Sequence, residues 1–167
     1  MIALLLAFPL FAFLVILQSS IVIMTPLLQG TADLILLTMV AWTLQERVKV
    51  YWQWTIIGAI FLSFVSKSSF IVILSVYLLV TGVVAISRFK IWKAPYLAMW
   101  AMTFVGTIIV HGVTLAGRWL GGVEIPFLQA FNLIILPSLL INLLLAAPVY
   151  ALVRDLANWL FPLEIEV

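Results

Sequence analysis

Long apolar runs alternate with short polar or charged breaks along the whole chain. Six runs consist almost entirely of aliphatic and aromatic residues, at about residues 2–24, 32–44, 52–65, 70–87, 95–116 and 127–153. A bilayer core about 30 Å thick needs about 20 apolar residues per helix, with a usual range of roughly 17–25. The pattern therefore predicts six transmembrane helices. The second, third and fourth are on the short side. The sixth is too long for a perpendicular span, so we expect either a tilted helix or first turns that lie in the interface.

Helix ends are expected where glycines, prolines and charges interrupt these runs. Pro95 suits the first turn of the fifth helix, because proline lacks an N–H that this turn leaves unpaired. The segment 117–122 (GRWLGG) is expected to end the fifth helix, and Arg154 with Asp155 the sixth. All seven tryptophans fall near expected helix ends, where indole rings favour the membrane–water interface. They are Trp42, Trp52, Trp54, Trp92, Trp100, Trp119 and Trp159.

Composition narrows the class of protein further. Of the 167 residues, 66% are hydrophobic and 8% are charged, whereas soluble domains carry about 25% charged residues. A soluble enzyme, a disordered chain and a nucleic-acid-binding domain are thereby excluded. Connections of about ten residues or fewer leave no room for a soluble catalytic domain. We expect one all-α membrane domain spanning residues 1–167, whose first run stays as an anchor because it lacks the basic start and cleavage site of a signal peptide.

The few basic residues predict the orientation. Cytoplasmic connections of membrane proteins carry an excess of Lys and Arg. If six helices cross the membrane, the side holding both termini carries six basic residues and the opposite side carries only Lys67 and Arg118. We therefore expect both termini in the cytoplasm. The six basic residues are Arg47, Lys49, Arg88, Lys90, Lys93 and Arg154.

Few residues of this chain could bind a metal, catalyse a reaction or carry an ion. The chain has no cysteine and one histidine, His111, too few ligands for a zinc or thiolate site. No serine–histidine–aspartate set or carboxylate pair is present, and no predicted helix carries a charged residue near its middle. Pumps and channels usually place ionisable groups there. We predict no metal, no cofactor, no enzymatic activity and no ion transport.

Polar residues on the fifth run share one helical face, at offsets of 4, 8 and 11 residues. One interpretation is a ligand or proton site around His111. The alternative, which we favour, is interhelical hydrogen bonding of the kind that Ser, Thr and His provide between membrane helices. The face consists of Thr103, Thr107, His111 and Thr114, with Gly106 and Gly112 nearby.

The sixth run is interrupted by Pro137, Ser138, Asn142 and Pro148. We favour a kinked, well-packed helix, because neighbouring side chains can satisfy the carbonyls that prolines free in a membrane. A broken helix that lines a substrate path is the alternative. Asp33, at the start of the second run, is expected to cap that helix, since a carboxylate pairs with free N–H groups at a helix N-terminus.

Several of these segments resemble the bacterial rod shape-determining protein MreD family. They are residues 32–37 (ADLILL), 41–44 (AWTL), 58–61 (GAIF, beginning at Gly58), 135–142 (ILPSLLIN) and 147–150 (APVY). The size of the chain, its six predicted spans and its predicted cytoplasmic termini are also similar to that family. One departure is residues 62–69 (LSFVSKSS), because the family commonly has an aspartate shortly after the glycine of span three and glycines in the following loop.

The resemblance implies a six-helix bundle similar to the substrate-binding components of vitamin (ECF-type) transporters. It also implies a non-enzymatic scaffold of the cell-elongation machinery in the bacterial cytoplasmic membrane, which helps control peptidoglycan synthesis and cell shape. The implied partner is the single-span protein MreC, and through it MreB, RodA and a class B penicillin-binding protein. We hypothesise that a lipid-exposed groove, partly lined by the fifth or sixth span, docks a partner helix. Candidate packing or partner-binding residues are Asp33, Gly58, Thr103, Gly106, Thr107, His111, Gly112, Pro137, Asn142 and Pro148.

Two other functions stay open. The chain could instead be the substrate-binding component of a vitamin transporter, with an outward solute pocket to which Asp33, His111, Arg118 and Glu124 contribute. It could also be an accessory subunit of another membrane complex. Ligand binding would distinguish a transporter component from a scaffold. The identity of co-purifying partners would distinguish an accessory subunit of another complex.

Overall fold

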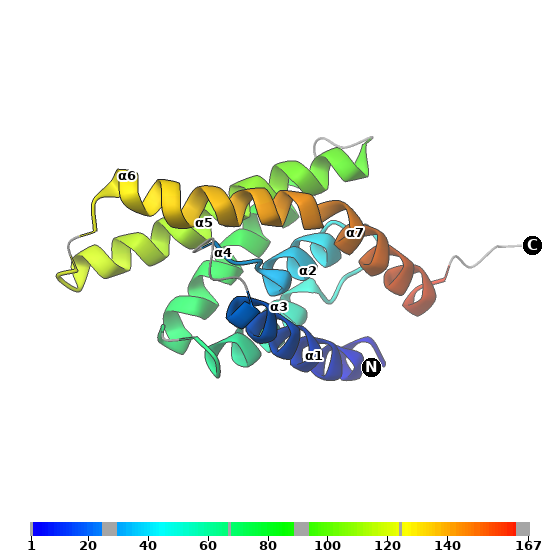
Figure 1. Ribbon diagram of the computed structural model, residues 1–167. Coiled ribbons are helices and arrows are strands. Elements are labelled where there is room, and N and C mark those ends of the chain that lie inside the picture. The colour runs from blue at the N-terminus through cyan, green and yellow to red at the C-terminus, as the bar shows by residue number, and fades with distance from the viewer. Residues whose placement is uncertain (1, 25–29, 67, 89–93, 124, 163–167) are drawn as a thin grey trace, which may run out of the picture.

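Every regular element in the described part of the chain is a helix (Figure 1). The computed structural model describes residues 2–24, 30–66, 68–88, 94–123 and 125–162, with the backbone alone for residues 21–24. A π-helical turn, η1 (Phe131–Ile135), joins α6 to α7 without a break. The helices are α1 (Ile2–Met24), α2 (Leu34–Thr43), α3 (Tyr51–Ser63), α4 (Phe70–Arg88), α5 (Pro95–Leu120), α6 (Phe127–Ala130) and α7 (Leu136–Leu160).

Four helical segments are long and apolar enough to cross a membrane: Ile2–Ser20, Phe70–Arg88, Pro95–Leu120 and Phe127–Leu160. By length and composition the chain is therefore a multi-pass helical membrane protein. Helices α2 and α3 have 10 and 13 residues, and at 1.5 Å per residue they are only about 15 and 20 Å long. Because that is shorter than a bilayer core of about 30 Å, the count of six spans stays a prediction.

Two helices extend beyond the expected apolar runs, although α5 still ends within the expected segment 117–122. Helix α5 continues through Gly117 and Arg118 to Leu120, since one glycine inside a helix costs only about 1 kcal/mol and the Arg118 side chain is exposed. The helix ends where Gly122 adopts a positive φ of 80°. The N–H of Val123 then donates to the carbonyl of Arg118 at 3.0 Å, and that of Gly122 donates to Trp119 at 3.0 Å. These are the paired bonds of a Schellman motif.

Helix α7 likewise continues past Arg154 and Asp155 to Leu160. The two charged side chains form an ion pair with 3.3 Å between Nη2 and Oδ1, and they are 42% and 68% exposed. Charges that reach water at a helix surface need not end the helix. The orientation of the termini stays a prediction, and Lys67, Lys90 and Lys93, on which it partly depends, lie outside the described residues.

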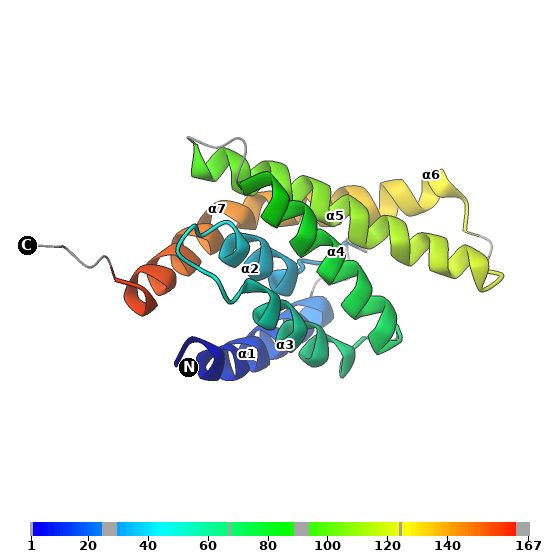
Figure 2. The ribbon, with the colours of Figure 1, turned by 180° about the vertical axis from the view of Figure 1, so that it is seen from behind.

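Helix α2 lies at the centre of the bundle. In both views it is placed between the long pair α5 and α7 on one side and α1 with α3 on the other (Figures 1 and 2). It contacts α1, α3, α4, α5 and α7, and all ten of its residues are buried. A helix that is apolar on every face is stable only when other elements surround it, which accounts for the sequence LILLTMVAW, apolar at every position except Thr38.

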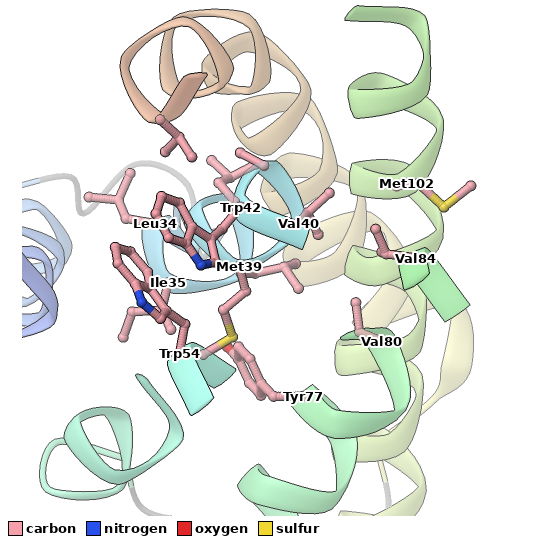
Figure 3. Packing of buried hydrophobic residues seen from close by; sticks show 14 of the residues in the cluster. Leu34, Ile35, Met39, Val40, Trp42, Trp54, Tyr77, Val80, Val84 and Met102 are labelled. Atoms are coloured by element: carbon pink, nitrogen blue, oxygen red, sulfur yellow. The ribbon is translucent and has the colours of Figure 1, made fainter. Parts of the chain in front are cut away.

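The core is organised around two stacked indole rings (Figure 3). The ring centroids of Trp42 on α2 and Trp54 on α3 are 3.8 Å apart, with an angle of 15° between the planes. Phe11 of α1 packs edge-on against Trp54 at 5.8 Å. Both tryptophans are 0% exposed, so the prediction that all seven mark the interface is wrong for these two. Trp42 lies on the fully buried helix α2, and Trp54 lies on the buried face of α3, so neither ring reaches the bundle surface.

The remaining described tryptophans are at the surface, as an interfacial position requires. Trp52, Trp100, Trp119 and Trp159 are all at least 39% exposed. Trp92 lies outside the described residues. Burial thus separates two structural tryptophans from four surface ones, although all lie near helix ends in the sequence.

Gly58 allows α3 to pack closely on α1 and α2. A Cβ atom at this position would overlap the terminal methyl of Met39 and lie 3.0 Å from Cε1 of Phe11. The Phe11 ring is itself fully buried and has little room to move. A larger residue here would therefore force α3 away from the core.

We expect Gly58→Val to lower the free energy of unfolding by about 1–3 kcal/mol, the usual cost of overpacking a core. Thermal unfolding in detergent, followed by tryptophan fluorescence, measures the change. Gly117→Val is the matched control, because no atom lies within 4 Å of a Cβ at Gly117, and it should change stability by less than about 0.5 kcal/mol. Equal losses in the two variants would contradict this packing role.

Candidate functional site

The N-terminus of α2 lies within the bundle and is capped by Asp33. The Oδ1 atom of Asp33 accepts a hydrogen bond from the N–H of Leu36 at 2.9 Å. The hydroxyl of Tyr77, on α4, donates to the other carboxylate oxygen. The prediction that Asp33 caps this helix is confirmed. The contact with Tyr77 adds a link to α4 that the sequence did not indicate.

Side chains from α1 and α7 accept hydrogen bonds from further backbone N–H groups of residues 31–34, the segment that leads into α2. Gln18 accepts from the N–H of Leu34 at 3.1 Å, and Asn142 accepts from the N–H of Asp33 at 2.8 Å. Ser138 accepts from the N–H of Thr31 at 3.0 Å. The first N–H groups of a helix have no partner within the helix, and hydrocarbon offers no water to replace one. The helix can therefore begin inside the bundle only because these oxygens are present.

Asn142 links this segment to α5 as well. Its side chain is 0% exposed, and Nδ2 donates to Oγ1 of Thr107 at 3.1 Å. The expected interhelical hydrogen bonding is confirmed at Thr107. Thr103, one turn earlier, is also fully buried, but its hydroxyl has no hydrogen-bond partner among the described residues.

The prolines of α7 occupy different environments. Pro137 is buried, and a Cβ atom on Gly30 would lie only 2.5 Å from the Pro137 Cβ. Gly30 therefore lets the segment before α2 lie directly against α7, a role that the sequence analysis missed. The π-helical turn η1 directly precedes the helix that carries Pro137. Pro148, by contrast, is exposed at the surface of α7.

The two glycine candidates on α5 also differ. A Cβ atom at Gly106 would lie 3.2 Å from Val80 and 3.3 Å from Leu36, so this glycine lets α5 approach α4 and α2. Gly112 is exposed and has no atom within 4 Å of a Cβ position. Gly106 thus packs inside the bundle, whereas Gly112 lies on its surface.

His111 lines a cleft of about 530 Å³ together with Arg118, Thr31 and Thr114. The hydroxyl of Thr114 donates to the carbonyl of Val110 at 2.7 Å. Asp33 caps α2 and is not among the residues that line this cleft, and Glu124 lies outside the described residues. Of the four residues considered for a solute pocket, the structure therefore brings together two.

A second hollow is almost wholly apolar and lies between α1 and α7, with α2 as its floor. It measures about 170 Å³. Leu34 and Thr38, on α2, are buried beneath it. The walls are formed by Leu10 and Leu14 on α1 and by Val149, Leu152, Val153 and Leu156 on α7. We call this hollow the α1–α7 groove.

Among the described residues, no group of three or more His, Asp or Glu side chains lies close enough together to hold a metal ion. No family model, curated protein or solved structure matches the chain. The resemblance to the MreD family therefore rests on the sequence segments given above.

We expect Asn142→Leu to lower stability by about 1–3 kcal/mol, because it leaves the buried N–H of Asp33 without a partner. Combining it with Thr107→Val should cost less than the sum of the single changes, with a coupling of at least about 0.5 kcal/mol. Unfolding in detergent measures the stability of the wild-type protein, the two single variants and the double variant. Asn132→Leu, at an exposed position of η1, is the control and should be near neutral. Strict additivity would contradict a direct bond between Asn142 and Thr107.

Proposed function

We propose that this chain is a non-enzymatic scaffold subunit of the bacterial cell-elongation machinery and that the α1–α7 groove docks the transmembrane helix of MreC. The observation that carries the proposal is the groove itself. Apolar side chains line it almost completely, and two helices long enough to cross a membrane form its walls. The MreD-like segments supply the identity of the partner.

The shape of the groove suits a helix that lies against the bundle. Its volume accommodates side chains rather than a whole helix, so the partner would lie across the opening and insert side chains between the walls. Close packing of this kind drives association in lipid, where apolar surfaces gain little from leaving the hydrocarbon. Leu152 is 71% exposed on one wall and is available to a partner.

In this proposal the chain crosses the cytoplasmic membrane six times, with both termini in the cytoplasm, and influences peptidoglycan synthesis through its partners. Bound MreC would connect it to MreB, RodA and a class B penicillin-binding protein. The proposed docking surface includes α7, as the hypothesis of a groove lined by the sixth span expects. Its other wall is α1 rather than α5, and Gly106 and Asn142 are buried away from it.

We expect Leu152→Trp and Leu14→Trp to reduce the recovery of co-expressed MreC about tenfold, because an indole would fill the groove. Affinity purification in mild detergent, with quantification of both proteins, measures the effect. Leu144→Trp is the control, because Leu144 is 77% exposed on the same helix and does not line the groove. Undiminished recovery with both groove variants, at normal expression, would place the partner elsewhere.

The cleft beside His111 favours the second candidate, a vitamin-binding component of a transporter. A volume of about 530 Å³ falls within the roughly 300–1,000 Å³ typical of small-molecule sites. Screening the purified protein against vitamins by thermal shift separates the two functions, since a specific ligand raises apparent stability. For a scaffold we expect no vitamin to stabilise the protein. A shift that Arg118→Gln abolishes would support the transporter component instead.

A further inference from the structure

A third cleft, with a volume of about 340 Å³, lies where α2, α4 and α7 end and α5 begins. Arg47, Arg88 and Arg154 all line it. These residues are far apart in the sequence, and each belongs to the set of basic residues that predicts the cytoplasmic side. The fold therefore concentrates three guanidinium groups around one opening at one end of the bundle.

Arg88 has a structural role in this cleft. Its Nη1 donates to the carbonyl oxygens of Thr43 and Val48, both at 3.2 Å. Its Cζ lies 4.7 Å from the centre of the Tyr51 ring. A cation at the C-terminus of a helix pairs with carbonyls that have no partner within the helix. Arg88 thus closes the end of α2 and forms a fixed wall of the cleft.

Arg47 and Arg154 make their contacts at the surface of the bundle. In the described part of the chain, Arg47 hydrogen-bonds to neutral oxygens at long range, Oδ1 of Asn158 at 3.5 Å and the carbonyl of Phe161 at 3.4 Å. Arg154 donates to Oδ1 of Asp155 from Nε and Nη2 and to the hydroxyl of Tyr96 from Nη1, all at 3.3 Å, and the side chains of the ion pair are exposed at the surface. Exposed ion pairs contribute at most about 1 kcal/mol, so both guanidinium groups can turn toward a stronger anionic partner.

The charge and size of the cleft favour a phosphate group. Among the described residues, Glu46 is the only acid that lines it, against three arginines, and the Glu46 side chain is exposed. Asp155, the partner of Arg154, does not line the cleft. Guanidinium groups bind phosphate through paired, charge-assisted hydrogen bonds. The volume is at the lower end of the range for small-molecule sites, sufficient for a headgroup.

The surroundings favour a phosphate that belongs to a lipid. Leu97 and Trp100, on the first turns of α5, are 54% and 45% exposed and present apolar surface beside the end of the bundle that holds the arginines. Basic pockets between membrane helices on the cytoplasmic side bind the headgroups of anionic lipids. We propose that this cleft binds the phosphate of an anionic phospholipid, with Arg47 and Arg154 as its ligands. The site does not depend on whether the α1–α7 groove docks a partner.

The test is a thermal-shift titration of the purified full-length protein in a neutral detergent. The probes are phosphatidylglycerol, phosphatidylcholine with the same acyl chains, and soluble glycerol 3-phosphate. We expect phosphatidylglycerol alone to stabilise the protein at micromolar concentration. Arg47→Gln and Arg154→Gln should each weaken its apparent affinity about tenfold, as the loss of one charge-assisted hydrogen bond predicts.

Two further variants keep the result interpretable. Lys49→Gln removes a positive charge from the same connection without touching the cleft lining and should leave lipid affinity within twofold. Glu46→Gln removes the opposing carboxylate and should strengthen binding, which a loss of folding could not imitate. Unchanged affinity in both arginine variants, or equal stabilisation by phosphatidylcholine, overturns the proposal. Equal affinity for glycerol 3-phosphate overturns the assignment to a lipid and leaves a soluble phosphate as the ligand.

Discussion

The structure depends on the pairing of backbone N–H groups where α2 begins. Water cannot solvate these groups inside the bundle, so oxygen atoms from three parts of the chain accept their hydrogen bonds: Asp33 of the segment itself, Gln18 of α1, and Ser138 and Asn142 of α7. The hydroxyl of Tyr77, on α4, donates to the capping carboxylate. Each of these side chains also fixes the position of the element that carries it. One requirement of local hydrogen bonding thereby determines how most of the bundle is arranged.

The surface of the bundle follows from this centre. Helix α1 packs on α2 and α3, whereas α7 packs on α2 and α5, so the two long helices flank α2 and leave the α1–α7 groove between them. Glycines at positions 30, 58 and 106 let backbone segments approach where a Cβ would collide or press on a neighbour. The cleft lined by arginines also depends on α2, because Arg88 donates a hydrogen bond to a carbonyl oxygen at the C-terminal end of this helix. Candidate binding surfaces therefore lie at both the side and the end of one central helix.

Local patterns in the sequence predicted local features well. The helices fall within a few residues of the apolar runs, except where α5 and α7 extend further, and Asp33 caps α2 as its position before an apolar run indicated. The bond between Asn142 and Asp33 joins residues 109 apart, and periodicity carries no information about such distances. Burial of Trp42 and Trp54 was missed for the same reason, since the enclosure of α2 and of one face of α3 depends on the other helices. The sequence predicted the polar face of α5. It did not predict that Thr103 and Thr107 on this face are buried whereas His111 is half-buried beside a cleft.

The position of α2 has a consequence for biosynthesis. Membrane helices emerge from the ribosome in order, from the N-terminus, yet two of the oxygens that pair with the N–H groups before α2 belong to α7, which is made after the other described helices. Backbone N–H groups without a partner have no stable place in hydrocarbon. The N–H groups of Leu34 and Leu36 can pair early, with Gln18 of α1 and with Asp33, but those of Thr31 and Asp33 gain their partners only when α7 has been synthesised. Assembly of the described bundle therefore depends on α7, and a chain that stops before this helix lacks two of the oxygen atoms that pair with the backbone before its central helix.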